Sequence, residues 1–195
     1  MEYAVAIIMG YLLGSIPVSL LVARRYDVDL RHTGDGNPGA WNALEQLGPR
    51  RAAPAFLGDA AKAFLAGLIG HALGDWWVAY AAVAAAMVGH AFPVFASFHG
   101  GKAVMAFVGG SFALSPLAAS AALLLCGAIT AATSFKWGAR IGVFAYPAIQ
   151  LAFDPVGYVI ATGALMSLIG ALFGIDALRS RFGRATRAAG SAPPA

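Results

Sequence analysis

Long apolar stretches, separated by short polar connections, recur along almost the whole chain. A run of about 20 apolar residues is long enough to cross a lipid bilayer as a helix. The pattern predicts seven membrane spans, of which the fourth and the sixth are shorter than this length. The spans cover approximately residues 3–23, 52–73, 76–95, 103–114, 117–134, 141–153 and 156–175.

The two short stretches leave open an alternative with five spans, in which each is merged with the stretch that follows it. That alternative would run helices through Pro116 and Pro155, and an internal proline removes a helical hydrogen bond and clashes with the preceding turn. We therefore expect seven spans, with the short ones tilted or broken where they line a cavity. The predicted fold class is all-α, a polytopic integral membrane protein with one transmembrane helical domain over residues 1–178. Residues 179–195 are expected to form a basic and then flexible cytoplasmic tail.

Composition supports a membrane location. Hydrophobic residues make up 59% of the chain and charged residues 11%, whereas soluble domains carry about 25% charged residues. The mean hydropathy is +0.72. No basic segment precedes the first apolar stretch, so we expect it to be a span rather than a cleavable signal. Cys126 is the one cysteine, and no pair of histidines has metal-ligand spacing, so we expect no disulfide, no metal site and no cofactor.

The charges alternate from one connection to the next. Of the 13 basic residues, all but Lys62 fall in the first, third and fifth connections or in the tail. The N-terminus and the other connections hold Glu2, Asp75 and Asp154 and no basic residue. Because cytoplasmic loops are enriched in Lys and Arg, we expect the N-terminus outside the cell membrane and the C-terminus in the cytoplasm. The net charge of +4 follows this topology and does not indicate a nucleic-acid partner.

Residues 89–102 end the third span and place Gly100-Gly101-Lys102 just before the fourth. Paired glycines leave backbone N–H groups uncovered, a following helix adds its positive N-terminal end, and the lysine adds a mobile charge. The segment is therefore a candidate phosphate site, and the alternative is a tight turn with a lysine at the membrane interface. His90 is nearby in the sequence, where it would donate to a phosphate or transfer a proton, or else act as a structural hydrogen-bonding residue.

A second candidate segment lies in the first polar connection, at residues 33–42. Its glycines, among them Gly36 and Gly39, fix a non-helical path, and Asn37 and Asn42 supply neutral hydrogen-bond donors and acceptors. The alternative is an ordinary surface loop. Under the predicted topology this connection faces the same side of the membrane as the glycine-lysine segment, so we expect the asparagines to orient a substrate there.

Two ionisable residues lie within the second span. Asp59 and Lys62 are three positions apart and therefore share a helix face. Ionisable side chains at membrane depth face the bundle interior and often mark a functional site, and the alternative is a structural pair that neutralises itself. In the first span, the Gly-Ser-Ile-Pro run at residues 14–17 supplies small residues that permit close helix packing.

Together these segments resemble the PlsY family, the bacterial acyl-phosphate:glycerol-3-phosphate acyltransferases. The family pattern includes Gly-Ser-Ile-Pro, matched at residues 14–17, a Gly-Ser-Gly-Asn-x-Gly-Ala-Thr-Asn run matched in part at residues 34–42, and Asp-x-x-Lys at residues 59–62. Its most specific run, Gly-His-x-Phe-x-x-Phe-x-x-Phe-x-Gly-Gly-Lys, is matched at residues 89–102. The order and spacing of these runs agree over about residues 10–116.

The resemblance implies a seven-span membrane enzyme that transfers an acyl group from acyl-phosphate to glycerol 3-phosphate, making lysophosphatidic acid for phospholipid synthesis. Its partners would be these two substrates, or another small acceptor, and membrane lipid, with the active site facing the cytoplasm. We expect catalytic roles for Lys102, His90 and Asn37. We expect substrate-binding roles for Gly36, Gly39, Asn42, Gly100, Gly101, Asp59, Lys62 and Lys136.

The chain departs from the family pattern at several positions. Asp35 stands where the family has serine and Glu45 where it has arginine, and the C-terminal His-Arg-x-Asn-Ile-x-Arg-Leu run has no counterpart in residues 177–190. Carboxylates oppose the binding of a phosphate unless Lys136, Arg140 or a tail arginine compensates for them. Two alternatives follow: the same scaffold with a non-phosphorylated acceptor, or a non-catalytic member that binds lipid or a membrane partner.

Overall fold

The computed structural model describes the backbone of residues 1–190 and the side chains of residues 1–178. Every regular element in this described part is helical, so the predicted all-α fold class is confirmed. The elements are α1 (Glu2–Gly14), α2 (Val18–Arg24), α3 (Ala40–Leu47), α4 (Pro49–Leu73), α5 (Trp76–Ala91), η1 (Val94–Ala96), α6 (Val104–Leu114), α7 (Pro116–Ala132), α8 (Phe135–Gln150) and α9 (Val156–Gly190).

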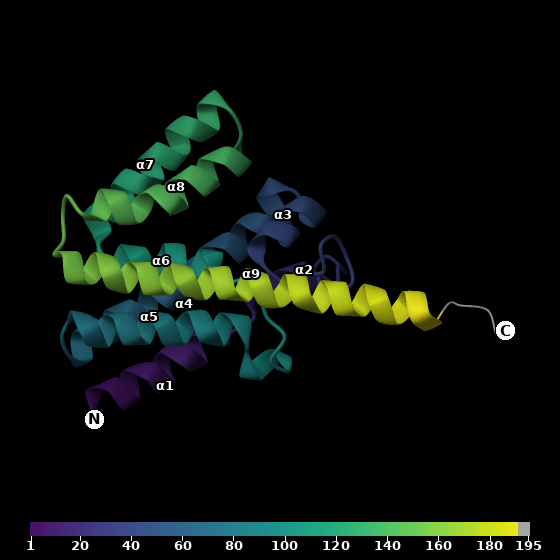
Figure 1. Cartoon of the computed structure of the whole chain (residues 1–195), viewed down its shortest axis with the longest axis horizontal. Coiled ribbons are helices and arrows are strands. Elements are labelled where there is room, and N and C mark those ends of the chain that lie inside the picture. The colour runs from purple at the N-terminus through teal and green to yellow at the C-terminus, as the bar shows by residue number, and fades with distance from the viewer. Residues whose placement is uncertain (191–195) are drawn as a thin grey trace.

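The predicted apolar stretches are present as seven helical units, with α1 and α2 forming one interrupted unit (Figure 1). The breaks that the prolines predict are also present, since α6 ends at Leu114 and α8 ends at Gln150. The number of units that cross the membrane, and their orientation, remain predictions. Four units are long and apolar enough to cross by length and composition, namely Glu2–Arg24, Pro49–Leu73, Trp76–Ala96 and Val156–Leu178.

Two segments that the sequence pattern predicts to be connections contain helix. Over residues 135–140 the prediction of a loop is wrong, because α8 already begins at Phe135. The Phe135 ring stacks on Trp41 with the ring centroids 5.7 Å apart, and the Arg140 guanidinium lies over the Trp137 ring. These aromatic contacts hold polar residues in a helix that the apolar pattern does not predict. The first polar connection likewise contains α3, which buries Ala43.

The last helix is longer than the seventh predicted span. That span is predicted to end near residue 175, whereas the backbone of α9 stays helical to Gly190. The arginines expected in the basic tail have side chains outside the described part of the chain, and residues 191–195 lie outside it altogether. Those arginines are Arg179, Arg181, Arg184 and Arg187.

Close helix packing depends on glycines that face a neighbouring backbone. A β-carbon on Gly14 of α1 would overlap the carbonyl oxygen of Ala86 on α5, and a β-carbon on Gly109 of α6 would overlap the carbonyl oxygen of Ala60 on α4. Small residues of this kind let membrane helices approach closely and gain van der Waals contact. The α1–α5 and α4–α6 pairs therefore hold the bundle together, whereas α7 and α8 pair mainly with each other and lean away from it (Figure 1).

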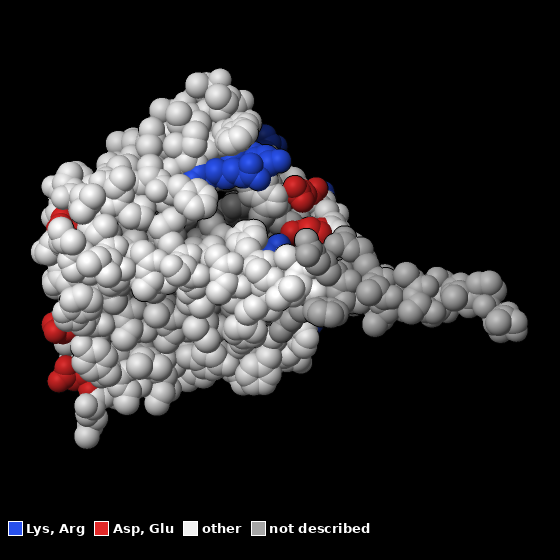
Figure 2. All heavy atoms as spheres, in the orientation of Figure 1, with Lys and Arg blue, Asp and Glu red and all other residues white. Residues whose placement is uncertain are grey.

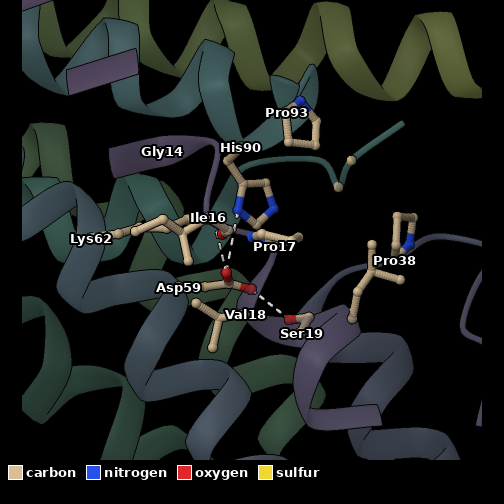
Figure 3. A pocket seen from close by; sticks show the side chains of 13 residues that line it. Gly14, Ile16, Pro17, Val18, Ser19, Pro38, Asp59, Lys62, His90 and Pro93 are labelled. Carbon is tan, nitrogen blue, oxygen red and sulfur yellow. Dashed lines mark hydrogen bonds and ion pairs between the residues drawn. The ribbon is translucent and has the colours of Figure 1, made fainter. Parts of the chain in front are cut away.

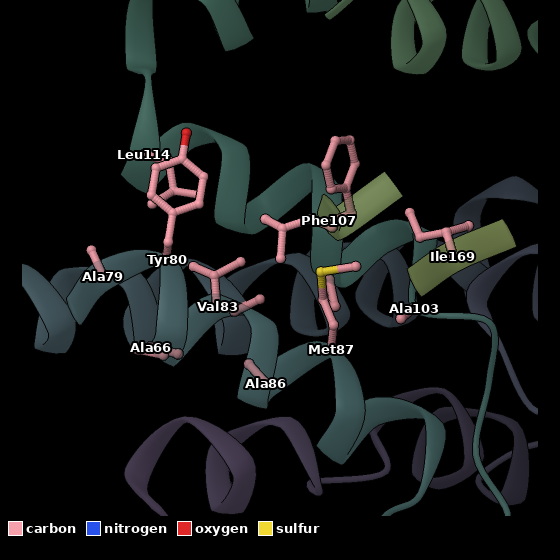
Figure 4. Close-up of a cluster of buried hydrophobic side chains, with 14 of the residues drawn as sticks. Ala66, Ala79, Tyr80, Val83, Ala86, Met87, Ala103, Phe107, Leu114 and Ile169 are labelled. Atoms are coloured by element: carbon pink, nitrogen blue, oxygen red, sulfur yellow. The ribbon is translucent and has the colours of Figure 1, made fainter. Parts of the chain in front are cut away.

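The hydrophobic core lies between α4, α5, α6 and the inward face of α9. Its largest fully buried apolar side chains are Phe107 of α6 and Met87, Val78 and Val83 of α5, and Ile169 of α9 closes one side (Figure 4). The Phe107 ring meets the Tyr146 ring of α8 edge to face, with centroids 5.8 Å apart. This packing fixes the ends of α5 and α6 relative to each other, and the connection between those ends carries the glycine-lysine segment.

Charged side chains are confined to the two ends of the molecule on the face in Figure 2. Lys and Arg gather only at the end where α2 and α3 lie, whereas the opposite end, near the N-terminus, shows only Asp and Glu (Figures 1 and 2). On this face, an uncharged surface separates the two ends (Figure 2). This distribution agrees with the alternation of charge along the sequence.

Candidate functional site

The first helix is broken where a polar residue of a neighbouring helix needs a backbone partner. α1 ends at Gly14 and α2 begins after Pro17, which cannot donate a helical hydrogen bond. The carbonyl oxygen of Ile16, exposed by this break, accepts a hydrogen bond from Lys62 Nζ at 2.9 Å. The Gly-Ser-Ile-Pro run therefore does more than allow close packing, because it also supplies a polar group to the interior of the bundle.

Asp59 and Lys62 form a buried ion pair. Lys62 Nζ lies 3.0 Å from Asp59 Oδ1, and the two side chains are only 5% and 1% exposed, respectively. The other carboxylate oxygen, Oδ2, accepts a hydrogen bond from the Ser19 hydroxyl at 2.5 Å. His90 Nδ1 approaches Asp59 Oδ1 at 3.5 Å (Figure 3). Asp59 is thus the centre of a cluster drawn from α2, α4 and α5.

His90 links this cluster to the glycine-lysine segment. Its Nδ1 side faces Asp59, and its Nε2 side faces Gly101, where an added β-carbon would lie 2.5 Å from Nε2. The imidazole is 6% exposed, and its position at the end of α5 follows from the break in the helix before Pro93. A histidine that lies beside a carboxylate on one side and a pocket on the other is able to accept or donate a proton there.

The amides of Gly100 and Gly101 are placed differently from the expectation. They donate to the backbone carbonyls of Ala91 and His90, each at 3.1 Å, so neither N–H group is directed at an anion. The glycines serve instead for close approach, because a β-carbon on Gly100 would overlap the carbonyl oxygen of His90. Lys102 is the cation of this segment and stands just before Ala103, the left-handed N-cap residue of α6.

Lys102 is held by two carboxylates from distant parts of the chain. Its Nζ lies 2.9 Å from Asp176 Oδ2 on α9 and 3.4 Å from Asp35 Oδ2 in the loop before α3. The ammonium also lies over the Phe173 ring, 5.0 Å from its centroid. Asp35 Oδ1 accepts the backbone N–H of Asn37 at 3.0 Å, so Asp35 brings Asn37 and Lys102 into one neighbourhood, as the sequence predicts.

Asn42 organises the polar loop. It is fully buried, and its Nδ2 lies within 2.9–3.1 Å of the carbonyl oxygens of Leu30, Thr33 and Asn37. An amide used in this way has no donor left for a substrate. These contacts give Asn42 a part in holding the loop, and its predicted role in orienting the acceptor remains a prediction.

Gly36 has a left-handed backbone, with φ at 73°, as a tight turn without a side chain allows. The side chain of Asn37 is half-buried, and Gly39 lies directly beneath its amide. In this region Asn37, rather than Asn42, is the neutral polar side chain that is free to meet a ligand.

Residues from all four predicted segments line one pocket. Figure 3 shows the break in the first helix, the buried Asp59–Lys62 pair, His90 and Pro38 arranged around it. Its remaining walls include Pro93, Gly100 and Gly101. Four sequence segments that are up to about 80 residues apart thus converge at one place.

Several predicted site residues do not line this pocket, namely Gly36, Asn37, Gly39, Asn42, Lys102 and Lys136. Lys136 is exposed at the start of α8. Its predicted role in substrate binding remains a prediction. Among the described residues, no group of three His, Cys, Asp or Glu side chains is arranged to hold a metal ion.

Two functional candidates were not predicted from the sequence. Ser19 belongs to an otherwise apolar part of the first span, and nothing in its neighbours indicates that its hydroxyl meets Asp59. Asp176 follows the seventh predicted span and precedes a run of arginines, so its sequence context indicates a solvated tail. Its contact with Lys102 depends on the straight course of α9 past the N-terminal end of α6.

Comparison with known proteins finds a family model described as glycerol-3-phosphate acyltransferase, matched over residues 4–185. A relative named glycerol-3-phosphate acyltransferase from Syntrophomonas wolfei is 35% identical over 171 residues, which cover 87% of this chain and 88% of that protein. Another of the same name from Rubrobacter xylanophilus is 45% identical over 111 residues, which cover 56% of each chain.

Solved structures agree in fold over nearly the whole length. Crystal structures of PlsY, described as an integral membrane glycerol 3-phosphate acyltransferase, match with TM-scores of 0.79 for the glycerol 3-phosphate form and 0.77 for the lysophosphatidic acid form. Sequence identity is 29% and 28%, respectively, and each alignment covers 94% of both chains. The resemblance that the sequence motifs carry thus extends through the C-terminal helices, where the motifs themselves are missing.

Proposed function

The chain belongs to the glycerol-3-phosphate acyltransferase family, and on this basis we propose that it transfers an acyl group from acyl-phosphate to glycerol 3-phosphate. The hydroxyl oxygen of the acceptor attacks the carbonyl carbon of the donor, and the bond from that carbon to the phosphate oxygen breaks. The hydroxyl proton is lost to a base, and the products are lysophosphatidic acid and inorganic phosphate. No covalent intermediate on the protein is needed.

The observation that carries this proposal is the convergence of the four family segments on one pocket. The Gly109 contact that packs α6 against α4 is not part of this pocket, whereas Gly14, which packs α1 against α5, is among its lining residues. The buried Asp59–Lys62 pair is costly to desolvate, and ionisable groups at membrane depth are typically functional. Both features support a site that handles charged substrates.

We assign His90 as the group that accepts the acceptor's hydroxyl proton. Its Nε2 faces the pocket beside Gly101, while Asp59 holds the Nδ1 side, an arrangement that keeps the second nitrogen available as a base. The Asp59 charge would stabilise the imidazolium that forms. Asn37, half-buried and next to Asp35, would orient the acceptor.

Lys102 would bind the phosphate of the donor. An ammonium placed beside the group on which negative charge accumulates stabilises the transition state more than the ground state. The end of the molecule that carries Lys102 is also the end where Lys and Arg gather (Figure 2). By the positive-inside rule, we place the pocket on the cytoplasmic side of the membrane.

The test uses purified protein in detergent with palmitoyl-phosphate and glycerol 3-phosphate. We expect lysophosphatidic acid, detected by mass spectrometry, and an equal amount of inorganic phosphate. Replacing Lys102 with alanine should lower kcat/KM about 100-fold or more, as the loss of one charge-stabilising group does. Arg50→Ala is the matched control, because it removes one cation, here an exposed one, from the same end of the molecule.

Absence of product from the wild-type protein, while a known family enzyme is active in the same assay, would reject the proposal. Unchanged activity of Lys102→Ala would reject the assigned role of Lys102 but not the reaction. Production of lysophosphatidic acid in a bacterial strain that lacks its own enzyme gives an independent measurement in a membrane.

A further inference from the structure

The proposed phosphate-binding lysine already has two anionic partners. Lys102 Nζ contacts Asp176 at 2.9 Å and Asp35 at 3.4 Å, and the lysine side chain is 15% exposed. Two carboxylates therefore contact one ammonium. A phosphate that approaches this group meets repulsion from the carboxylates as well as attraction from the lysine.

The two carboxylates come from different elements. Asp35 is anchored within its own loop, because its second oxygen accepts the Asn37 backbone N–H at 3.0 Å. Asp176 is carried by α9, where Phe173, one turn earlier, also covers the lysine. Along this part of α9, Ile169 and Leu172 face the core, whereas Gly170 and Gly174 face open space.

We propose that Asp35 and Asp176 form a carboxylate latch that occupies Lys102 until a substrate phosphate displaces Asp176, and that the latch sets the affinity for phosphate-bearing substrates. This inference rests on the proposed acyltransferase function. Asp35 stays in place when the phosphate binds, because the Asn37 N–H holds it, and it continues to weaken the phosphate–lysine contact. Asp35 and Asp176 are then specificity-determining residues that act through Lys102 and do not touch the reacting carbon.

The latch also connects two distant elements. Asp35 lies in the loop that presents Asn37, and Asp176 lies on the last helix, so the lysine ties that loop to α9. Displacement of Asp176 would break this tie between Lys102 and α9 and widen access to Lys102. The bound phosphate and the Asp176 carboxylate therefore compete for one ammonium.

Removal of either carboxylate should strengthen phosphate binding, which is the opposite of what loss of a structural contact does. We compare wild-type protein with Asp176→Asn and Asp35→Asn, which keep the size of each side chain, and Asn at position 35 keeps the acceptor for the Asn37 N–H. We expect each change to lower KM for palmitoyl-phosphate about threefold to tenfold, from the usual strength of a partly exposed ion pair. The inhibition constant of inorganic phosphate should fall by a similar factor.

Asp27→Asn is the matched control. It removes an exposed carboxylate at the same end of the chain, and asparagine tolerates the left-handed backbone at this position. KM and the phosphate inhibition constant should stay within twofold of the wild-type values. A fall in this control as large as that in the two test variants would overturn the latch in favour of a general effect of net charge.

The latch is also overturned if both test variants are folded and active but bind phosphate no more tightly than the wild-type protein. Thermal unfolding monitors folding, and Asp35→Ser, which installs the residue of the resembling family, provides a second variant if Asp35→Asn fails to fold. A wild-type protein that makes no product would instead reject the proposed function. Even then, the affinity for inorganic phosphate, measured by calorimetry, still tests the latch in all variants.

Discussion

Removal of the negative charge at Asp59 should destabilise the protein strongly. Asp59 is the common partner of Lys62, His90 and Ser19, and both members of the ion pair are almost fully buried. Asp59→Asn is nearly isosteric and keeps an oxygen that can accept the Ser19 hydroxyl. The substitution therefore removes the charge and leaves the Lys62 ammonium buried with the Ile16 carbonyl as its remaining partner.

The magnitude follows from the cost of an uncompensated buried charge. Removal of one partner of a buried ion pair typically costs about 3–5 kcal/mol. For a chain of this size, each kcal/mol lowers the unfolding midpoint by about 2–4 °C, so we expect a fall of about 6–20 °C. If Lys62 is also replaced, by methionine, no charge is left unpaired, and neutral replacement of both partners is often tolerated. In the double variant, the fall in the unfolding midpoint should be at most half of that in Asp59→Asn.

The assay is thermal unfolding in detergent at one scan rate, followed by the fluorescence of the four tryptophans, with activity measured in parallel. Asp59→Asn and the double variant should both lose activity, because His90 loses its anionic partner in each. The reasoning is refuted if Asp59→Asn unfolds within about 2 °C of the wild-type protein. It is equally refuted if the double variant loses as much of the unfolding midpoint as Asp59→Asn and Lys62→Met lose together when each is made alone. The cost would then not come from the unpaired ammonium.

Two further predictions concern residues that position the site. Asn42→Ala removes the amide that binds three loop carbonyls. The change should raise KM for glycerol 3-phosphate and speed proteolytic cleavage of that loop. Unchanged cleavage would contradict the positioning role. Gly109→Ala introduces a β-carbon that overlaps the Ala60 carbonyl, and it should cost about 1–3 kcal/mol of stability. Its control is Gly127→Ala, where no atom lies within 4 Å and alanine should be neutral or stabilising.

The convergence of the site could be predicted from sequence because a membrane limits the possible topologies. Once the apolar stretches are fixed, the first and third connections must lie on the same side, and these connections carry the loop with Asn37 and the segment with Lys102. The depth of Asp59 and Lys62 within the second span then places them beneath both connections. No long-range contact is needed for this deduction, since chain direction and span length supply it.

The use of the glycine amides could not be predicted. Paired glycines serve equally well for an anion site or for the close approach of two backbones, and the local sequence is the same in both cases. The deciding fact is that His90 and Ala91 carbonyls lie opposite Gly101 and Gly100. That placement depends on how the chain turns after Pro93, which involves left-handed residues at Ser97 and Phe98.

The helix at residues 135–140 was not predicted, for a different reason. Lys136 and Arg140 reduce the apolar character of the segment, and Gly138 suggests a turn. In the structure, Gly138 lies close against the Cys126 carbonyl of α7, so the glycine serves helix packing. The segment is helical because of its contacts with α7 and with Trp41, and such contacts have no signature in hydropathy.

With the glycine amides engaged by backbone carbonyls, Lys102 is the cation that the glycine-lysine segment itself carries, and the proposed binding of a phosphate there would depend on the contacts of Lys102 with other residues. An anion held by several backbone N–H groups would be little affected by one nearby carboxylate, because those groups cannot be drawn away from it. An anion held by a single flexible ammonium competes directly with any carboxylate within reach. The departure at Asp35 and the approach of Asp176 therefore matter in this chain because of the hydrogen bonds that Gly100 and Gly101 make.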